Sequence, residues 1–226
     1  MVTNGCSHFV DAKAGKRCGP VETEGDAREG IRVLRCFVAV EVGAGLRRAM
    51  EATQATLRRG FGTSDPVKWV PAHQFHFTLK FLGEISEEAA GRAGGAVDRA
   101  VRSVSPFTLS LAGLGAFPQP ERPAVLWAGV ANGRERLAAL AAAVERELVA
   151  EGFPAERRRF QPHLTLGRVR EGASVPRAVV ENLARQAGQE FGAFRVERVV
   201  LMRSELTPRG PIYSVLHSAP LREEIP

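Results

Sequence analysis

HFTL at residues 76–79 and HLTL at residues 163–166 are two copies of one tetrapeptide, His-x-Thr-Leu, and their histidines are 87 residues apart. The first copy lies in the strand-like segment HQFHFTLKFLG (73–83), and the second lies in RFQPHLTLGRV (159–169). Side chains alternate between the two faces of a strand, so each histidine shares a face with the threonine two residues later. Each segment is therefore predicted to present an imidazole beside a hydroxyl, with apolar residues on the opposite face.

The elements around the two copies follow the same order. Apolar runs and alternation predict strands, whereas helical spacing, as in Leu46, Met50 and Leu57, predicts helices. In chain order we predict a strand at 36–42, a helix at 43–60, strands at 67–70 and 73–83, a helix at 86–103 that Ser86 caps, strands at 107–117 and 124–130, a helix at 134–152, a strand at 159–169, a helix at 176–187, and paired strands at 194–206 and 212–221. The chain thus contains two strand–helix–strand–helix–strand units, and internal duplication is the simplest account.

A single histidine in a strand is most often a structural residue. Two copies at matching points of two matching units are much harder to obtain by chance. Two lobes related by a pseudo-twofold axis would bring the two strands together, so that His76 and His163 would face one another.

Two facing imidazoles suit in-line displacement at phosphorus. A neutral imidazole can take a proton from the attacking water, and a protonated one can give a proton to the departing sugar oxygen, because its pKa is about 6.5. The hydroxyls of Thr78 and Thr165 can donate to the non-bridging oxygens, whose negative charge grows in the transition state. The pattern therefore indicates acid–base catalysis by His76 and His163.

A metal site is the main alternative for paired histidines. It would need further His, Asp, Glu or Cys ligands on the same strand faces. By alternation the same-face neighbours are Gln74 and Lys80 in the first strand, and Gln161 and Gly167 in the second. None is a good ligand, and Lys80 would repel a cation. We therefore expect neither a metal nor a cofactor.

The composition, with 44% hydrophobic and 25% charged residues, is that of a soluble globular protein. The chain lacks both the apolar run of about 18 residues that a membrane span needs and the apolar stretch of a secretory signal. We therefore expect a cytoplasmic protein that binds no membrane. The formal charge of +6 suits a polyanionic partner, although an arginine-rich composition alone identifies none.

Residues 1–30 have few apolar residues and no clear periodicity, so we expect a poorly ordered extension. Cys6, His8, Cys18 and Cys36 match no compact zinc-finger spacing, and three cysteines do not indicate a disulfide framework. Cys36 falls within an apolar strand, where a buried free thiol is expected.

Longer segments are specific to one family. They are RCFVAVEV, VKWVPAHQFHFTLKFLGEI, LSLAGLGAFPQPERPAVLWAGV, QPHLTLGRV and MRSELTPRGPIYSVLHSAPL, which span Arg35 to Arg222. On these segments the chain resembles the 2H phosphoesterase superfamily, and specifically the RNA 2′,3′-cyclic phosphodiesterases, also called 2′–5′ RNA ligases. The resemblance implies an α+β fold with two pseudo-twofold lobes, in which two antiparallel-rich sheets surround a central cleft and the helices lie outside. We expect residues 31–226 to form this single domain, with lobes at about 31–118 and 119–226 that can exchange strands.

The resemblance also implies hydrolysis of a 2′,3′-cyclic phosphate at an RNA terminus, which leaves a 2′-phosphate. His76 matches the family's first histidine, usually the general acid, and His163 matches the second, usually the general base. The pseudo-symmetry makes these two roles easy to exchange. Arg168 matches an arginine that contacts the phosphate, although alternation places it on the face opposite His163 unless Gly167 permits a bulge.

Two aromatic residues, Phe37 and Phe81, are candidates to contact a base, although aromatic residues in strands more often form core. His73 and His217 lack a threonine two residues later, and we expect both to be structural.

Three functions remain open on the sequence alone. The first is a monomeric RNA 2′,3′-cyclic phosphodiesterase. The second is a related 2H phosphodiesterase or ligase that acts on 2′–5′ linked oligonucleotides or small cyclic nucleotides. The third is an RNA-binding module without turnover, which would predict the loss of a histidine or a threonine, whereas both pairs are intact.

Overall fold

An apolar strand, β1 (Val33–Glu41), lies inside a sheet and is covered on both faces. Val38 and Val40 face the main core, while Phe37 and Ala39 face a smaller apolar cluster. This double covering explains the continuous apolar run in the sequence. The structure is a computed structural model that describes residues 32–208 and 210–222. The predicted poorly ordered extension, residues 1–30, lies outside the described residues.

The described residues belong to one compact unit. Its elements confirm the predicted order of strands and helices, with one exception given below. After β1 they are α1 (Ala44–Arg59), β2 (Val67–Trp69), the 3-10 turn η1 (Ala72–Gln74), β3 (His76–Ser86), α2 (Glu87–Val101), β4 (Phe107–Phe117), β5 (Val125–Val130), α3 (Arg134–Ala150), β6 (His163–Val169), α4 (Arg177–Arg185), β7 (Glu190–Val196), β8 (Arg198–Thr207) and β9 (Gly210–Pro220).

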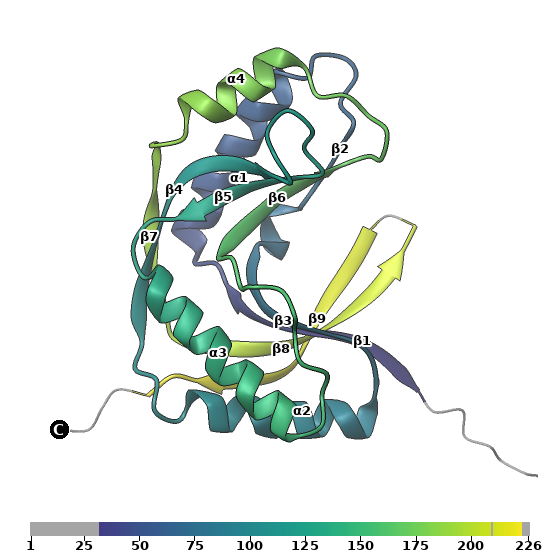
Figure 1. Ribbon diagram of the computed structural model, residues 1–226, viewed down its shortest axis with the longest axis vertical. Helices are drawn as coiled ribbons and strands as arrows, with labels where there is room; N and C mark the ends of the chain where they lie inside the picture. Colours follow the sequence, from purple (N-terminus) through teal and green to yellow (C-terminus); the bar gives the residue numbers. More distant parts are fainter. Residues whose placement is uncertain (1–31, 209, 223–226) are drawn as a thin grey trace, which may run out of the picture. The chain divides into compact units, whose positions relative to one another are not determined.

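The described strands form two antiparallel sheets. The first sheet has the order β3-β1-β8-β9, and the second has the order β2-β6-β5-β4-β7. Helix α2 packs on the first sheet with α3 beside it, while α1 and α4 pack on the second sheet (Figure 1). The predicted α+β class, with antiparallel sheets and helices outside them, is confirmed.

The two sequence units exchange strands. Strand β4 belongs to the first unit but pairs with β5 of the second, and β8 belongs to the second unit but pairs with β1 of the first. Each sheet therefore combines strands from both sides of the boundary that we predicted near residue 118. The chain passes between the sheets four times within the described residues, at β1–β2, β2–β3, β3–β4 and β7–β8.

One predicted strand is wrong. The segment 194–206 is not a single strand, because β7 joins the second sheet and β8 joins the first. The break lies at Glu197 and Arg198, two consecutive exposed residues that interrupt the alternation of buried and exposed positions. There the backbone can leave one sheet and enter the other without burying a polar side chain.

Two helices show how local sequence fixes their place. Leu46, Met50 and Leu57 of α1 are buried, as their spacing predicts. Ser86 caps α2, and its hydroxyl accepts a hydrogen bond from the Ala89 amide at 3.1 Å, a contact worth about 1 kcal/mol. None of the helices in the described part of the chain has the length and apolar character that crossing a bilayer requires.

Candidate functional site

The two predicted histidines open corresponding strands of the two sheets. His76 is the first residue of β3 in the first sheet, and His163 is the first residue of β6 in the second. Strands β3 and β6 lie against one another, although they belong to different sheets (Figure 1). The charge on His163 is close enough to affect the pKa of His76. The fold therefore brings the two copies of the repeated tetrapeptide together.

The two imidazoles are held in the same way. The Nδ1 atom of His76 lies 2.7 Å from the Gln74 carbonyl oxygen, and Nδ1 of His163 lies 2.7 Å from the Gln161 carbonyl oxygen. A carbonyl oxygen can only accept, so each Nδ1 must carry the hydrogen. In the neutral ring this leaves the lone pair on Nε2, which can accept a proton from a ligand.

Aromatic rings fix the orientation of both imidazoles. The centroid of His76 is 4.8 Å from that of Phe37 and 5.4 Å from that of Tyr213, which meets it edge-on. Phe117 meets His163 edge-on at 5.1 Å. Packing of this kind limits rotation of each ring and keeps its Nε2 atom in place.

The pKa of each histidine is lowered. Burial is the main cause in both cases, because it disfavours the charged imidazolium. The hydrogen bond to the backbone carbonyl opposes this effect, and the positive charge of Arg168 adds to the lowering. The resting site therefore favours neutral histidines, and a bound anion would favour protonation.

A β-bulge brings Arg168 to the histidine side of β6. Gly167 pairs with Leu126 and Thr165 pairs with Trp127, so Leu166 is left without a partner in β5. Leu166 and Gly167 are both buried, and the extra residue returns Arg168 to the face of Thr165. The charge of Arg168 affects the pKa of His76, His163 and Tyr213. The bulge thus resolves the conflict between strand alternation and the place expected for Arg168.

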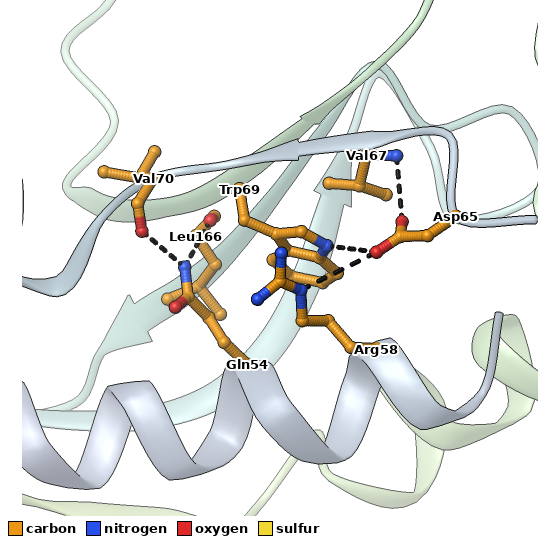
Figure 2. Close-up of polar contacts among 7 residues, drawn as sticks. All are labelled: Gln54, Arg58, Asp65, Val67, Trp69, Val70 and Leu166. Atoms are coloured by element: carbon orange, nitrogen blue, oxygen red, sulfur yellow. Dashed lines mark hydrogen bonds and ion pairs between the residues drawn. The ribbon is translucent and has the colours of Figure 1, made fainter. Parts of the chain in front are cut away.

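The bulge is supported from behind by a buried glutamine. Gln54 of α1, only 6% exposed, donates from Nε2 to the Leu166 carbonyl at 2.7 Å and to the Val70 carbonyl at 2.8 Å (Figure 2). The Val70 amide also donates to the Leu166 carbonyl, at 2.9 Å. Gln54 was not predicted as part of the site, although a polar side chain on the apolar stripe of α1 was the available signal.

Strand β2 covers the outer edge of β6 beside the bulge. A Cβ atom on Gly167 would lie 2.5 Å from Val67, so only glycine fits where the two strands meet. Asp65 anchors β2, because its carboxylate accepts hydrogen bonds from the Trp69 indole at 2.7 Å and from the Val67 amide at 2.9 Å (Figure 2). Arg58 of α1 lies 3.7 Å from the same carboxylate.

The prediction that Lys80 shares the face of His76 is wrong. In β3, Thr78 pairs with Ala39 and Lys80 pairs with Val38, so Leu79 forms a bulge. The bulge turns Lys80 away from His76 and into the interior, where its ammonium donates to Glu145 at 2.6 Å and to the Pro154 carbonyl at 2.7 Å. Lys80 therefore gives no argument against a cation at the histidines.

The two candidate base contacts differ in exposure. Phe37 is 3% exposed and packs against His76, Phe81 and Tyr213, so it supports these rings and offers little surface to a base. Phe81 is 64% exposed. Tyr213, the only tyrosine in the chain, was missed, since nothing in its local sequence indicates that β9 reaches His76.

The remaining polar groups fall into two sets. Thr78 and Thr165 are half-buried, and within the described residues neither hydroxyl makes a hydrogen bond.

His217 lies away from the histidine pair and contacts Asp98 of α2 at 2.8 Å. Residues 32–208 and 210–222 contain no group of three or more His, Cys, Asp or Glu side chains that could hold a metal ion.

Comparison with known families agrees with this arrangement. The model of the 2′-5′ RNA ligase superfamily matches residues 46–208, which include both tetrapeptides. The chain belongs to the 2′-5′ RNA ligase superfamily. The family resemblance seen in the sequence is thereby confirmed.

Several members of the superfamily match most of the chain. An RNA 2′,3′-cyclic phosphodiesterase of Aeropyrum pernix is 40% identical over 155 residues, which cover 69% of this chain and 86% of the relative. One of Methanothermobacter thermautotrophicus is 39% identical over 181 residues, which cover 80% and 95%. Among solved structures, the TT0787 protein of Thermus thermophilus has a TM-score of 0.67 at 37% identity, and the match covers 85% of this chain and all of that one. The LigT protein of E. coli, crystallised with 3′-AMP, has the same TM-score and coverage at 25% identity.

Proposed function

We propose that this chain hydrolyses the 2′,3′-cyclic phosphate at an RNA terminus to a 2′-phosphate, with His76 and His163 as general acid and base. The observation that carries the proposal is the matched pair of imidazoles. Each has Nδ1 bound to a backbone carbonyl, and each therefore keeps Nε2 for the reaction. The names of the relatives, RNA 2′,3′-cyclic phosphodiesterases, support the choice of substrate.

The reaction exchanges one phosphorus–oxygen bond for another. A water oxygen attacks phosphorus while the Nε2 atom of the neutral histidine takes its proton. The bond between phosphorus and the 3′-oxygen breaks, and the 3′-oxygen takes a proton from Nε2 of the other, protonated histidine. The base ends protonated and the acid neutral. The base then releases a proton to solvent and the acid takes one up, which restores the starting state. The family pattern gives the acid role to His76 and the base role to His163.

The charges around the two histidines favour a change in their protonation when substrate binds. Burial and Arg168 lower the pKa of both histidines in the free protein, which keeps the base neutral. The negative charge of a bound phosphodiester offsets Arg168 and favours protonation of one imidazole. Substrate binding would thus protonate the histidine that acts as the acid and leave the histidine that acts as the base neutral.

We assign the phosphate oxygens to Arg168, Thr78 and Thr165. The bulge at Leu166 supports the role of Arg168, because it returns the guanidinium to the face of Thr165. A guanidinium can bind two phosphate oxygens at once. The two hydroxyls have no other hydrogen-bond partner among the described residues, so both are available to donate to a ligand.

The proposed reaction uses no metal ion and no cofactor. The polar groups assigned to it are two histidines, two threonines and an arginine, and this set contains too few ligands for a catalytic zinc site. The proposal further includes a monomer that acts in the cytoplasm, as the sequence led us to expect.

The test is a product assay on a short RNA with a 2′,3′-cyclic phosphate end, in EDTA, from pH 5 to pH 9. We expect a 2′-phosphate product and a bell-shaped rate profile. His76→Ala and His163→Ala should each lower kcat by about 10²–10⁴-fold or more. His73→Ala, at an exposed histidine in η1, is the matched control and should retain full activity. Activity lost in EDTA and restored by zinc would contradict the metal-free reaction, and a 3′-phosphate product would contradict the assigned leaving group.

A further inference from the structure

A groove lies beside the histidine site on the first sheet. One wall is the middle of β3, at Phe81, Leu82 and Gly83, and the other is the segment 153–156 between α3 and β6. The catalytic groups proposed above are absent from its lining. The proposed reaction therefore assigns no role to this groove.

An exposed aromatic ring forms one wall. Phe81 pairs with Phe37 of the neighbouring strand β1, and the bulge at Leu79 turns its ring to the same face as His76. Its centroid is 6.1 Å from that of Phe37, which in turn is 4.8 Å from that of His76. Phe81 is nevertheless 64% exposed, so this ring next to the site lacks a partner on its outer side.

The opposite wall is fixed to the sheet. Lys80, buried behind Phe81, donates to the Pro154 carbonyl at 2.7 Å and to Glu145 at 2.6 Å. Glu145 also accepts from the Glu156 amide at 2.8 Å, and the Glu156 carboxylate accepts from the Arg158 amide at 3.0 Å. These bonds hold the segment in a defined place, so the groove is preformed.

Positive charge follows each wall of the groove: Arg157 comes directly after Glu156, and Arg35 pairs with Glu84, the residue after Gly83. Arg157, Arg158 and Arg159 follow the fixed segment directly, and all three are exposed. Arg35 lies on β1 two residues before Phe37, and its charge reaches Tyr213 on the histidine side of the sheet. Within the described residues, none of these four arginines forms an ion pair.

We infer that the RNA nucleotides preceding the cyclic phosphate terminus bind in this groove, with a base stacked on Phe81 and their phosphates toward Arg157, Arg158 and Arg159. The inference rests on the proposed function. Single-stranded nucleic acids are bound by aromatic rings combined with cations that follow the backbone, which is the combination present here. A mononucleotide would leave the groove empty, so the preferred substrate is an oligonucleotide.

The experiment compares two substrates with the same terminal base: a mononucleotide 2′,3′-cyclic phosphate and a tetranucleotide ending in one. For the unmodified chain we expect kcat/KM to be at least about 10-fold higher for the tetranucleotide, since stacking of one base contributes about 1–3 kcal/mol. Phe81→Ala should lower the ratio of the two values by at least about 5-fold. The variant R157Q/R158Q/R159Q should lower it as well, and should weaken its dependence on salt.

The variant R48Q/R102Q/R185Q is the matched control, because it removes the same charge from positions elsewhere. It should leave the ratio unchanged. A parallel titration with a fluorescent tetranucleotide that carries a 2′-phosphate measures binding without turnover, and the groove variants should bind it at least about 5-fold more weakly.

Equal kcat/KM for the two substrates in the unmodified chain would overturn the inference. So would groove variants that lower both values by the same factor, or that bind the labelled RNA as tightly as the control. Failure of the proposed function looks different: neither substrate would be hydrolysed, while the titration would still report on the groove.

Discussion

Replacing Gln54 by leucine tests how α1 supports the edge of the second sheet. The Gln54 amide is 6% exposed and donates to two carbonyl oxygens, those of Val70 and Leu166. Leucine has a similar volume but no donor. The Leu166 carbonyl keeps the bond from the Val70 amide, whereas the Val70 carbonyl loses the donor that Gln54 provides.

The magnitude follows from these contacts. One buried and one partly buried hydrogen bond are lost, and the partly buried Val70 carbonyl is left without this donor, so Gln54→Leu should lower the free energy of unfolding by about 2–3 kcal/mol. For a domain of this size the melting temperature should fall by about 5–10 °C. Differential scanning calorimetry and urea unfolding both measure this change. Glu51→Leu, at an exposed position of the same helix, is the control and should shift the melting temperature by no more than about 2 °C.

The same substitution also tests whether Gln54 positions Arg168 through the bulge. Leu166 is the bulged residue, and the bulge sets the direction of Arg168. Gln54→Leu should therefore raise KM more than it lowers kcat, measured well below the melting temperature. In the Arg168→Ala background this effect on KM should disappear, because a residue that acts only through Arg168 has nothing left to position. An unchanged melting temperature, or equal effects on KM in both backgrounds, would refute the reasoning.

Three further perturbations test other parts of the structure. Glu145→Gln should lower the free energy of unfolding by about 1–2 kcal/mol more than Lys80→Met does, as measured by urea unfolding. The reason is that Glu145→Gln leaves the buried Lys80 ammonium without its counter-charge, whereas Lys80→Met leaves a carboxylate that water reaches. The reverse order would contradict this account. Burial lowers the pKa of His76 and His163 in the folded state, so the unfolded chain binds more protons between these values and about 6.5. The free energy of unfolding should thus fall as the pH drops through that window, and H76N/H163N should flatten this dependence. Parallel curves of the free energy of unfolding against pH for the variant and the unmodified chain would show that the two histidines are not its source. Arg168→Gln should raise the pKa of both histidines, which shifts the acidic limb of the kcat/KM profile to higher pH; a shift to lower pH would be inconsistent with a nearby positive charge.

Local patterns in the sequence were sufficient for most of the elements and for the main candidate site residues. Strand alternation placed His76 beside Thr78 and His163 beside Thr165, because neighbouring side chains on one strand face depend only on the chain itself. The stripe of Leu46 and Met50 on α1 and the Ser86 cap of α2 were predictable for the same reason. The repetition of His-x-Thr-Leu indicated that the two strands act as a pair.

Alternation failed at the bulges. It placed Lys80 beside His76 and Arg168 opposite His163, and the extra residues at Leu79 and Leu166 reverse both positions. A bulge is defined by two residues opposite one residue of the neighbouring strand, so it exists only once the partner and its register are known. The sequence of β3 or β6 alone contains neither.

What the sequence by itself determined about this protein is the order of its elements, its α+β class and the paired imidazoles with their hydroxyls. Only the tertiary structure decided that β2 and β4 of the first unit join the second sheet and that β8 and β9 of the second unit join the first. It also decided that β7 and β8 separate, and that Gln54 and Tyr213 support the candidate site. The physical reason is the range of the interactions. Periodicity and capping act over a few residues, whereas strand partners are selected by contacts between segments more than a hundred residues apart in the chain, as with β1 and β8.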